Sequence, residues 1–570
     1  MLNFKIKKDG ENQCIETNLC GKPLLTTPQL NKGTAFTEEE RHAFKIIGKI
    51  PARIETLDDQ VKRCYLQYKT YKNNLNRNIY LNELHDTNQV LFYKLVSEHL
   101  QEMLPAIYTP IVGTAVKKFS EEYRRPRGLY VSYQEREHIL EILNNRSNPE
   151  IDLIVVTDGE GVLGIGDQGI GGMDIPIAKL MVYTLCGGIN PCRTLPILLD
   201  VGTNNEELLN DPLYLGWRHP RLAGKEYDDF IGEFVDAVHK TFPDIFLHWE
   251  DFGRDNARKN LERYQNSLCT FNDDMQGTGV VTLAAILAGV HAKNEQLKDQ
   301  RVVVFGGGTA GTGIADQIAD AMVREGLSQE DAYKNFWMLD RPGLLTSDIK
   351  DLTDFQKTYA RDPKEITSWQ LQQANTINLL DVINNVKPTI LIGCSAVTNA
   401  FNEQIIKNMA EYVERPIILP LSNPTERAEA TPVDIFTWTQ GRAMVATGSP
   451  FDDINYNGVN VRIAQCNNAF VFPGIGLGLI AVKAKHLSGA TLWAACNALS
   501  DHSPVIKNPT APLLPAIDEA QEIALKIATA VAKQVIKEKN NTINIKGDLE
   551  SHIKSIMWEP YYLPMRFRSP

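Results

Sequence analysis

A chain of 570 residues, 43% of them hydrophobic and 23% charged, has the composition of a globular protein with several domains. Its 59 Lys and Arg residues against 70 Asp and Glu residues give a formal net charge of −11, so we expect no nucleic-acid and no membrane partner. No apolar run approaches the length of a spanning helix, no targeting peptide is evident, and the nine cysteines contain no C-x-x-C pair, which predicts a cytoplasmic protein with free thiols.

The first part of the chain has a helical pattern. Residues 37–145 carry apolar side chains at three- and four-residue spacing with charges between them, which predicts a helical front domain. From about residue 150 the pattern changes to short apolar runs separated by helical stretches: IDLIVVTD, RTLPILLDVG and DIFLHWEDF. This alternation predicts βα units and a largely parallel sheet.

A second set of buried strands follows, with helices between them. Each of the five runs ends in Gly, Ser, Asn or Asp: RVVVFGGG, NFWMLD, TILIGCS, RPIILPLSN and AMVATGS. Runs of this length rich in β-branched residues favour strands of a second parallel sheet. After residue 470 the chain returns to helix and ends in a basic, aromatic tail.

Two glycine-rich segments compete for the role of nucleotide-binding loop. The segment 159–172 contains the G-x-G-x-x-G spacing twice, but no acidic residue ends a following strand. In contrast, Gly306, Gly308 and Gly311 directly follow a predicted strand and open a helix, whose N–H groups and dipole suit a pyrophosphate. Asp340 ends the next strand, where it suits a ribose hydroxyl and repels a 2′-phosphate. We therefore assign the dinucleotide to the second segment and expect the first to approach the substrate.

Two pairs of acids suggest a metal site. Glu250 and Asp251 follow a predicted strand, and Asp273 and Asp274 precede a long apolar helix. Taken alone, the first pair suits a solvated surface and the second a helix cap. Taken together, four carboxylates suit Mg²⁺ or Mn²⁺, which prefer oxygen ligands.

Other candidate side chains have two interpretations each. Lys179 lies on an apolar helix face, either as a lysine that reaches solvent or as a base made less basic by burial. Tyr108 suits a core position or a proton donor at a loop tip. Asn423 ends a parallel strand, where α/β sheets bind ligands, while Asn467 and Asn468 are ambiguous.

The chain resembles the malic enzyme family over nearly its whole length. The motifs that carry the resemblance are LNKGTAFTEEER, YTP, RRPRG, VVTDGE, LGIGDQG, LDVGTNN, EDFG, CTFNDDMQGT, LSNPT, ATGSPF and NNAFVFPG. The resemblance implies an NAD-dependent enzyme that oxidises and decarboxylates L-malate to pyruvate and CO₂ with Mn²⁺ or Mg²⁺. It also implies a homodimer or homotetramer.

The resemblance further implies an α/β fold with a Rossmann-type NAD-binding domain inserted into a parallel-sheet substrate domain. The implied ranges are 1–126 for the helical N-terminal domain, 127–272 completed by 467–536 for the substrate domain, 273–466 for the NAD-binding domain and 537–570 for the C-terminal tail.

Roles are implied residue by residue. They are Tyr108 as general acid, Lys179 as general base with Asp273 as its carboxylate partner, Glu250, Asp251 and Asp274 as metal ligands, Gly306, Gly308, Gly311, Asp340, Asp274 and Asn423 as cofactor contacts, and Asn423, Asn467, Asn468 and Gly161 at the substrate.

One position departs from the family pattern. Gly161 stands in DGEG, where many malic enzymes have an arginine that contacts the substrate carboxylate, so a bidentate clamp is missing. Malolactic enzymes, which convert malate to lactate and retain NAD, look similar here and in MDIPIAKLMVYT and LHWEDFGR. YTP and RRPRG favour ordinary NAD-dependent malic enzymes. A catalytically inactive NAD-binding sensor is disfavoured because the lysine, the tyrosine and the metal acids are present.

Overall fold

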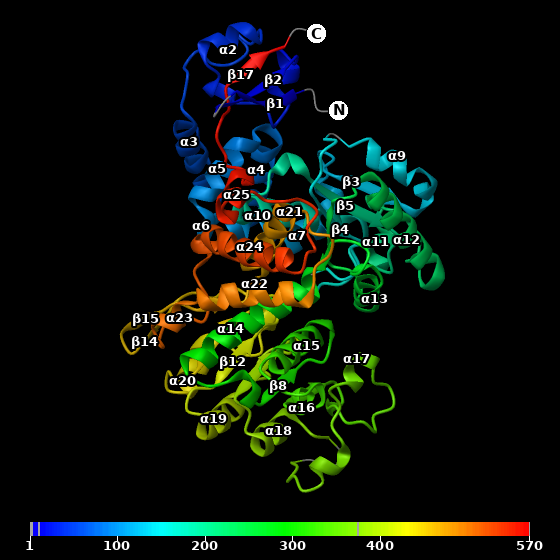
Figure 1. The fold of residues 1–570 in the computed structure, drawn as a ribbon, viewed down its shortest axis with the longest axis vertical. Helices are drawn as coiled ribbons and strands as arrows, with labels where there is room; N and C mark the ends of the chain where they lie inside the picture. The colour runs from blue at the N-terminus through cyan, green and yellow to red at the C-terminus, as the bar shows by residue number, and fades with distance from the viewer. Residues whose placement is uncertain (1–3, 10–11, 147, 163, 373–375, 569–570) are drawn as a thin grey trace. The chain divides into compact units, whose positions relative to one another are not determined.

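The computed structural model divides the chain into two compact units (Figure 1). The first unit consists of Met1–Gly253 and Lys554–Pro570, and the second of Arg254–Ile553. The residues that the structure describes are 4–9, 12–146, 148–162, 164–372 and 376–568.

The first unit begins with a β-hairpin, which the sequence pattern does not predict. β1 (Phe4–Asp9) pairs antiparallel with β2 (Asn12–Thr17), and β17 (Met565–Phe567) of the tail joins β2 in parallel. Phe4 and Ile15 belong to one apolar cluster that includes the tail. The hairpin therefore depends on contacts between the two ends of the chain, which no local pattern reveals.

The helical pattern of residues 37–145 is confirmed except at Leu129–Ser132, which form a strand of the parallel sheet and not a helix. α3 (Leu57–Thr70) begins with a capping box, in which the Thr56 side chain accepts from the Asp59 N–H and the Asp59 side chain accepts from the Thr56 N–H. The other α-helices of this region are α2 (Glu38–Ala43), α4 (Asn74–Thr87), α5 (Gln89–Glu98), α6 (Leu100–Ile107), α7 (Ile111–Lys117), α8 (Phe119–Glu122) and α9 (Ile139–Asn144), and the short α1 (Lys22–Leu25) precedes the region.

A parallel sheet forms the rest of the first unit, as the sequence predicts. Its strands lie in the order β3 (Leu129–Ser132), β5 (Thr194–Asp200), β4 (Leu153–Thr157) and β6 (Phe246–Trp249). β4 and β6 are buried at every position, which explains their continuous apolar runs. The helices that accompany the sheet are α10 (Asp174–Gly187), α11 (Glu206–Asn210) and α12 (Gly224–Thr241).

The second unit contains a seven-stranded sheet with the order β10-β9-β8-β11-β12-β13-β16. In chain order these strands read 3-2-1-4-5-6-7, so the order reverses between β8 and β11, as in a Rossmann fold. The short β10 runs antiparallel to β9. The bounds are β8 (Val302–Phe305), β9 (Phe336–Asp340), β10 (Gly343–Leu344), β11 (Ile390–Gly393), β12 (Ile417–Pro420), β13 (Met444–Thr447) and β16 (Ala464–Gln465). The five predicted strands are β8, β9, β11, β12 and β13.

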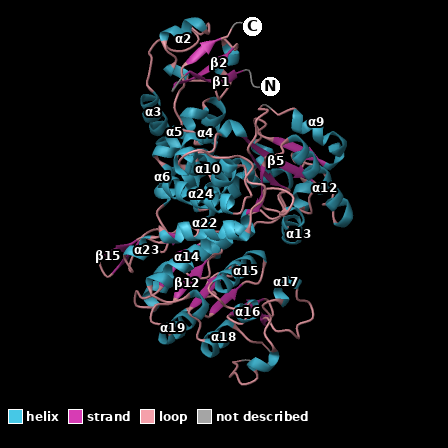
Figure 2. Cartoon of the chain, viewed as in Figure 1, coloured by secondary structure: helices cyan, strands magenta, loops and turns pink. Residues whose placement is uncertain are grey.

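Helices cover both faces of this sheet (Figure 2). Ile418 of β12 packs with α18 (Leu379–Val386) and α19 (Glu403–Tyr412) in one apolar cluster. Its neighbour Ile417 points to the opposite face, where it meets Gly289 of the long helix that precedes β8. Burial on both faces is what makes these strands apolar at successive positions.

The remaining elements of the second unit are mainly helical. They are β7 (Thr270–Asn272), β14 (Ile454–Tyr456), β15 (Val459–Val461), α13 (Arg254–Tyr264), α14 (Thr278–Ala292), α15 (Thr309–Arg324), α16 (Gln329–Tyr333), α17 (Asp354–Lys357), α20 (Pro432–Trp438), α21 (Phe472–Val482), α22 (Gly489–Asp501), α23 (Pro504–Lys507) and α24 (Ala520–Lys537); α25 (Leu549–Ile556) follows them.

One helix corrects an expectation about membrane spans. The stretch Asp273–Ala292, which includes α14, is long and apolar enough to cross a membrane by length and composition, so the expectation that no run approaches this length was wrong. However, 78% of its apolar window is buried inside the protein, and α14 packs against α15 and α22. A core helix enclosed by other helices has this composition because its side chains contact protein on all sides.

Candidate active site

Lys179 lies in a buried chain of polar side chains in the first unit. Its Nζ donates a hydrogen bond to Tyr108 Oη at 2.9 Å and forms an ion pair with Glu250 Oε1 at 2.8 Å. Tyr108, Lys179 and Glu250 are only 7%, 3% and 2% exposed. The interpretation of Lys179 as a lysine that reaches solvent is therefore wrong, because its ammonium group ends on buried partners.

Regular helix and strand geometry brings these groups together. Lys179 and Tyr183 are four residues apart on α10, so their side chains point to the same side of the helix. His248 and Glu250 are two residues apart at the end of β6 and share one face of the sheet. Since α10 packs against β4 and β5, its buried face lies over this sheet.

His248 and Tyr183 extend the polar chain beyond the residues that the sequence suggested. His248 Nε2 lies 2.5 Å from Glu250 Oε2, and His248 Nδ1 lies 2.7 Å from Tyr183 Oη. A carboxylate only accepts hydrogen bonds, so Nε2 carries a proton; in the singly protonated ring Nδ1 then accepts from the tyrosine hydroxyl. The alternation in HWE could have suggested that His248 faces Glu250, but nothing local pairs His248 with Tyr183.

A buried arginine fixes the glycine-rich segment 159–172. Arg221, whose side chain is 2% exposed, donates to the Asp158 carbonyl oxygen at 3.0 Å and pairs with Asp167 at 2.7 Å. Burial acts to raise the pKa of Asp167, but the hydrogen bond and charge of Arg221 outweigh it and hold that pKa below its ordinary value. The segment is thus held in place just before the helix that carries Lys179.

Gly161 packs its backbone against the segment that follows β6. Its N–H donates to the Asp251 carbonyl oxygen at 2.8 Å, and a Cβ atom on Gly161 would lie 2.5 Å from the Phe252 carbonyl oxygen. Asp251 has a φ of 54°, in the left-handed region that Asn and Asp adopt more readily than other side chains. A side chain at Gly161, such as the arginine of the family pattern, fits only if this backbone shifts.

The other two acids belong to the second unit. Asp273 and Asp274 open a π-helical turn, η5 (Asp273–Gly277), which leads into α14; turns of this kind are frequent at functional sites. Asp273 is fully buried, and Asn468 Nδ2 donates to its Oδ2 at 2.9 Å. The structure therefore brings together two of the predicted site residues, Asp273 and Asn468, from distant parts of the sequence.

The loop after β8 has the geometry of a dinucleotide-binding turn. Gly306 has a φ of 117°, which residues with side chains rarely adopt. A Cβ atom on Gly311 would lie 2.0 Å from the Gly306 carbonyl oxygen, so the close packing of α15 on the loop requires glycine there. Gly308 immediately precedes α15, where backbone N–H groups are open to a phosphate.

Two charged side chains flank this loop. Asp340, at the end of β9, accepts a hydrogen bond from Gln356 Nε2 at 3.0 Å, and the same amide donates to the Gly307 carbonyl oxygen at 2.9 Å. Arg254, at the start of α13, has its Nη2 3.4 Å from the position of a Cβ atom on Gly308. Sequence reasoning missed Arg254, although it directly follows EDFG.

Asn423 and Asn467 hold their side chains in local contacts. Asn423 Oδ1 accepts from Ser449 Oγ at 2.5 Å, and Asn423 is exposed just beyond β12. Asn467 Oδ1 accepts from the Ala469 N–H at 2.9 Å and caps a short 3-10 turn. Their amide Nδ2 groups are the parts of these side chains that suit an anionic ligand.

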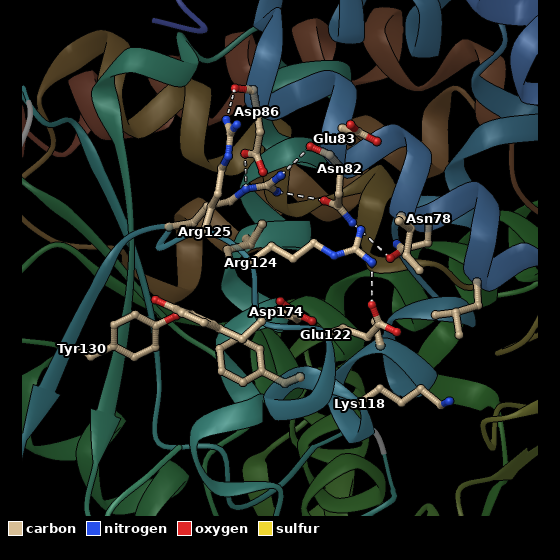
Figure 3. Close-up of a pocket in the computed structure, with 17 residues that line it drawn as sticks. Asn78, Asn82, Glu83, Asp86, Lys118, Glu122, Arg124, Arg125, Tyr130 and Asp174 are labelled. Carbon is tan, nitrogen blue, oxygen red and sulfur yellow. Dashed lines mark hydrogen bonds and ion pairs between the residues drawn. The ribbon is translucent and has the colours of Figure 1, made fainter. Parts of the chain in front are cut away.

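A cavity of about 320 Å³ lies against the start of α10 (Figure 3). Among its lining residues, Arg124 pairs with Glu122 at 2.9 Å and Arg127 pairs with Asp86 at 2.7 Å. Asp174, the first residue of α10, also lines it, and burial raises the pKa of this carboxyl to about 6. None of the site residues suggested by the sequence is among the described residues that line this cavity.

Comparison with known proteins identifies the regions to which these sites belong. The family model for the malic enzyme N-terminal domain matches residues 85–265, and the model for the malic enzyme NAD-binding domain matches residues 275–536. The first match includes Tyr108, Lys179 and Glu250, and the second includes the loop after β8.

Similar proteins cover nearly the full chain. NAD-dependent malic enzyme 3 of Bacillus subtilis is 49% identical over 99% of this chain and 100% of its own length. The NAD-dependent malic enzyme of Photorhabdus laumondii is 50% identical over 95% of this chain and 96% of its own. Among solved structures, the malic enzyme of Entamoeba histolytica has a TM-score of 0.55 and 21% identity, with 90% of each chain covered, which supports the fold.

Proposed function

The chain belongs to the malic enzyme family, and from this premise we propose that it oxidises and decarboxylates L-malate to pyruvate and CO₂ while reducing NAD. The main support for this proposal is the burial of Lys179 between the Tyr108 hydroxyl and the Glu250 carboxylate. A buried amine in contact with a phenol, which can donate a proton, is suited to acid–base catalysis on a small substrate.

Lys179 and Tyr108 account for both proton transfers. Lys179 in its neutral amine form, assisted by Asp273, takes the proton from the C2 hydroxyl as hydride leaves C2, and Tyr108 later donates a proton to C3 of the enolate formed when CO₂ leaves. The distance of 2.9 Å between Lys179 Nζ and Tyr108 Oη lets the lysine return its proton to the tyrosine. The proton removed from oxygen thus replaces the one delivered to carbon.

Glu250, Asp251 and Asp274 would hold Mn²⁺ or Mg²⁺. Their carboxylate oxygens are the donors that these hard cations prefer, and no thiol or thioether belongs to the set. The metal ion supplies Lewis-acid polarisation of the substrate oxygen at C2. His248 holds the second oxygen of Glu250 at 2.5 Å and so orients this carboxylate.

NAD would bind along the loop after β8. Gly306, Gly308 and Gly311 admit the pyrophosphate, and Asp340 accepts from an adenosine ribose hydroxyl. Arg254 adds a positive charge beside Gly308.

Further substrate and cofactor contacts follow the family pattern. We assign Asn423, Asn467 and Asn468 to the substrate, with Gly161 giving it backbone access. Asn423 and Asp274 also contact the cofactor.

We also propose a domain division, an oligomeric state and a cellular compartment. The four sequence ranges given above remain our division into domains. We expect a homodimer or homotetramer that works in the cytoplasm, where the apolar α14 serves as a core helix rather than a membrane span.

The proposal is tested by following nicotinamide absorbance with L-malate, NAD and Mn²⁺ after removal of bound metal with a chelator. We expect NADH to form only when both malate and metal are present. Tight binding of NAD without any turnover would instead favour the inactive sensor.

A further inference from the structure

Glu429 is a fully buried carboxylate in the second unit. Its Oε1 accepts from the Ser395 N–H at 2.8 Å, from Ser395 Oγ at 2.9 Å and from Ser422 Oγ at 2.5 Å. Among the described residues these partners are backbone and hydroxyl groups rather than a cation. Several hydrogen bonds compensate the burial of this side chain, so the chain around it must keep its conformation.

The partners of Glu429 lie in two different loops at the carboxyl edge of the sheet. Ser395 follows β11, and Ser422 follows β12. Ser422 Oγ also accepts from the Ala396 N–H at 2.8 Å. Glu429 and Ser422 therefore tie the segment 394–398 to the segment 421–426.

The space around Glu429 is matched to its carboxyl group. A Cβ atom on Gly393, the last residue of β11, would lie 2.5 Å from Glu429 Cδ. A Cβ atom on Gly306 would lie 2.5 Å from the carbonyl group of Cys394. The segment that Glu429 fixes thus touches the first glycine of the dinucleotide-binding turn.

The position in the sheet indicates which part of a dinucleotide this segment meets. Strand order reverses between β8 and β11, and dinucleotides bind across such a reversal. Asp340 marks the adenosine side at the end of β9. The nicotinamide half therefore extends over the ends of β11 and β12, where Asn423 directly follows Ser422.

We propose that Glu429 is a positioning residue for the nicotinamide half of the cofactor. It acts through the segments 394–398 and 421–426 and does not touch the cofactor itself. This inference rests on the proposed function, because it takes the cofactor to be NAD.

The test compares the binding of NAD with that of AMP, which has only the adenosine half. In Glu429→Ala, the N–H and hydroxyl groups of Ser395 lose their acceptor, so the segment moves. By calorimetry without malate, we expect the Kd for NAD to rise roughly 10-fold, which corresponds to the loss of about one charged hydrogen bond, and the Kd for AMP to stay within about twofold. Unchanged AMP binding also shows that the nucleotide domain is folded.

A second variant and a control keep the test decisive. Ser422→Ala removes the hydroxyl group between Glu429 and Ala396 and replaces Glu429→Ala in the test if that variant does not fold. We expect the Kd for NAD to rise by a similar factor in Ser422→Ala, with the Kd for AMP unchanged. Glu40→Gln changes a buried carboxylate of the first unit, paired with Lys32 at 2.5 Å, and should lower stability without changing the Kd for NAD.

Three results would overturn the inference. They are an equal rise in the Kd for NAD and for AMP, an unchanged Kd for NAD in a folded variant, and a wild-type protein that binds neither nucleotide. Wild-type protein that binds NAD but does not turn over malate contradicts the proposed function alone, because the binding measurements contain no malate.

Discussion

The side chain of Lys179 is only 4% exposed, and its ammonium group contacts the Tyr108 hydroxyl and the Glu250 carboxylate. In Lys179→Ala the proposed general base is lost while malate keeps its other contacts. We expect kcat to fall by ~100-fold or more and the KM for malate to change much less, as for the loss of a general base. Steady-state kinetics with malate, NAD and Mn²⁺ measure both.

Lys32→Ala provides the matched control for this variant. Lys32 is also buried and pairs with a carboxylate, Glu40, and burial lowers its pKa. Its removal should lower the midpoint of thermal unfolding without a comparable fall in kcat. A Lys179→Ala protein that loses stability but keeps its turnover would show that Lys179 is only structural.

Asp174 links burial to pH dependence. Burial raises the pKa of its carboxyl from 3.8 to about 6, and the charge of Arg127 opposes this only in part. Between these values the folded state binds a proton that the unfolded state releases, so the free energy of unfolding falls as pH rises through this range. Asp174→Asn should remove this fall in the free energy of unfolding, because asparagine does not titrate.

We therefore expect Asp174→Asn to be more stable than the wild type at pH 7.5 by about 1–2 kcal/mol, after discounts for partial solvent screening and for the favourable position of an acid at a helix start. The difference should shrink as the pH approaches 4. Urea unfolding at several pH values measures it, and a constant difference across the range would contradict the explanation.

At the scale of elements, the loop around Gly161 shows how backbone contact limits substitution. The sequence suggests that Gly161→Arg would tighten malate binding if the loop kept its conformation. A Cβ atom there would lie 2.5 Å from the Phe252 carbonyl oxygen, so the loop must move. We expect Gly161→Ala and Gly161→Arg both to raise the KM for malate, because they share this clash.

The comparison of these two variants separates steric from electrostatic effects. Gly113→Ala is the control, because a Cβ atom on Gly113 meets nothing within 4 Å. A lower KM in Gly161→Arg than in the wild type would mean that the loop accepts the side chain and that the arginine binds the substrate carboxylate.

β9 carries the prediction on cofactor choice. Asp340 is fixed beside Gly307 through Gln356 and would repel the 2′-phosphate of NADP. We expect a clearly higher kcat/KM for NAD than for NADP, and Asp340→Ser should narrow the ratio by weakening this repulsion. Equal kcat/KM values for NAD and NADP in the wild type would contradict the role of Asp340. In that case Arg341 would be the residue that pairs with the 2′-phosphate.

Elements with a strong local signal could be predicted from the sequence. β8, β9, β11, β12 and β13 are apolar over successive residues because the sheet is covered on both faces. The hairpin β1–β2 could not be predicted because its two strands, FKIKKD and NQCIET, carry mostly polar residues, and β10 could not because it has only two residues. Their stability comes from contacts with β17 and β9, which lie elsewhere in the sequence.

The candidate site was predictable to the extent that it rests on motifs. Local pattern singled out Lys179, Tyr108 and Glu250 and the resemblance implied their roles, and the structure places Lys179 in contact with both of the others. His248 and Glu429 were not named, because their significance depends on partners that only the folded chain supplies. Long-range hydrogen bonds of this kind leave little trace in local spacing.

The intact enzyme is expected to release both pyruvate and NADH. Gly161 leaves the malolactic reaction as the competing outcome, since both reactions begin with malate and NAD. The direct measurement is product analysis after incubation with L-malate, NAD and Mn²⁺. We predict one NADH and one pyruvate for each malate consumed. Malate loss with lactate as the product and no lasting NADH would contradict the release of pyruvate and assign the malolactic reaction to this enzyme.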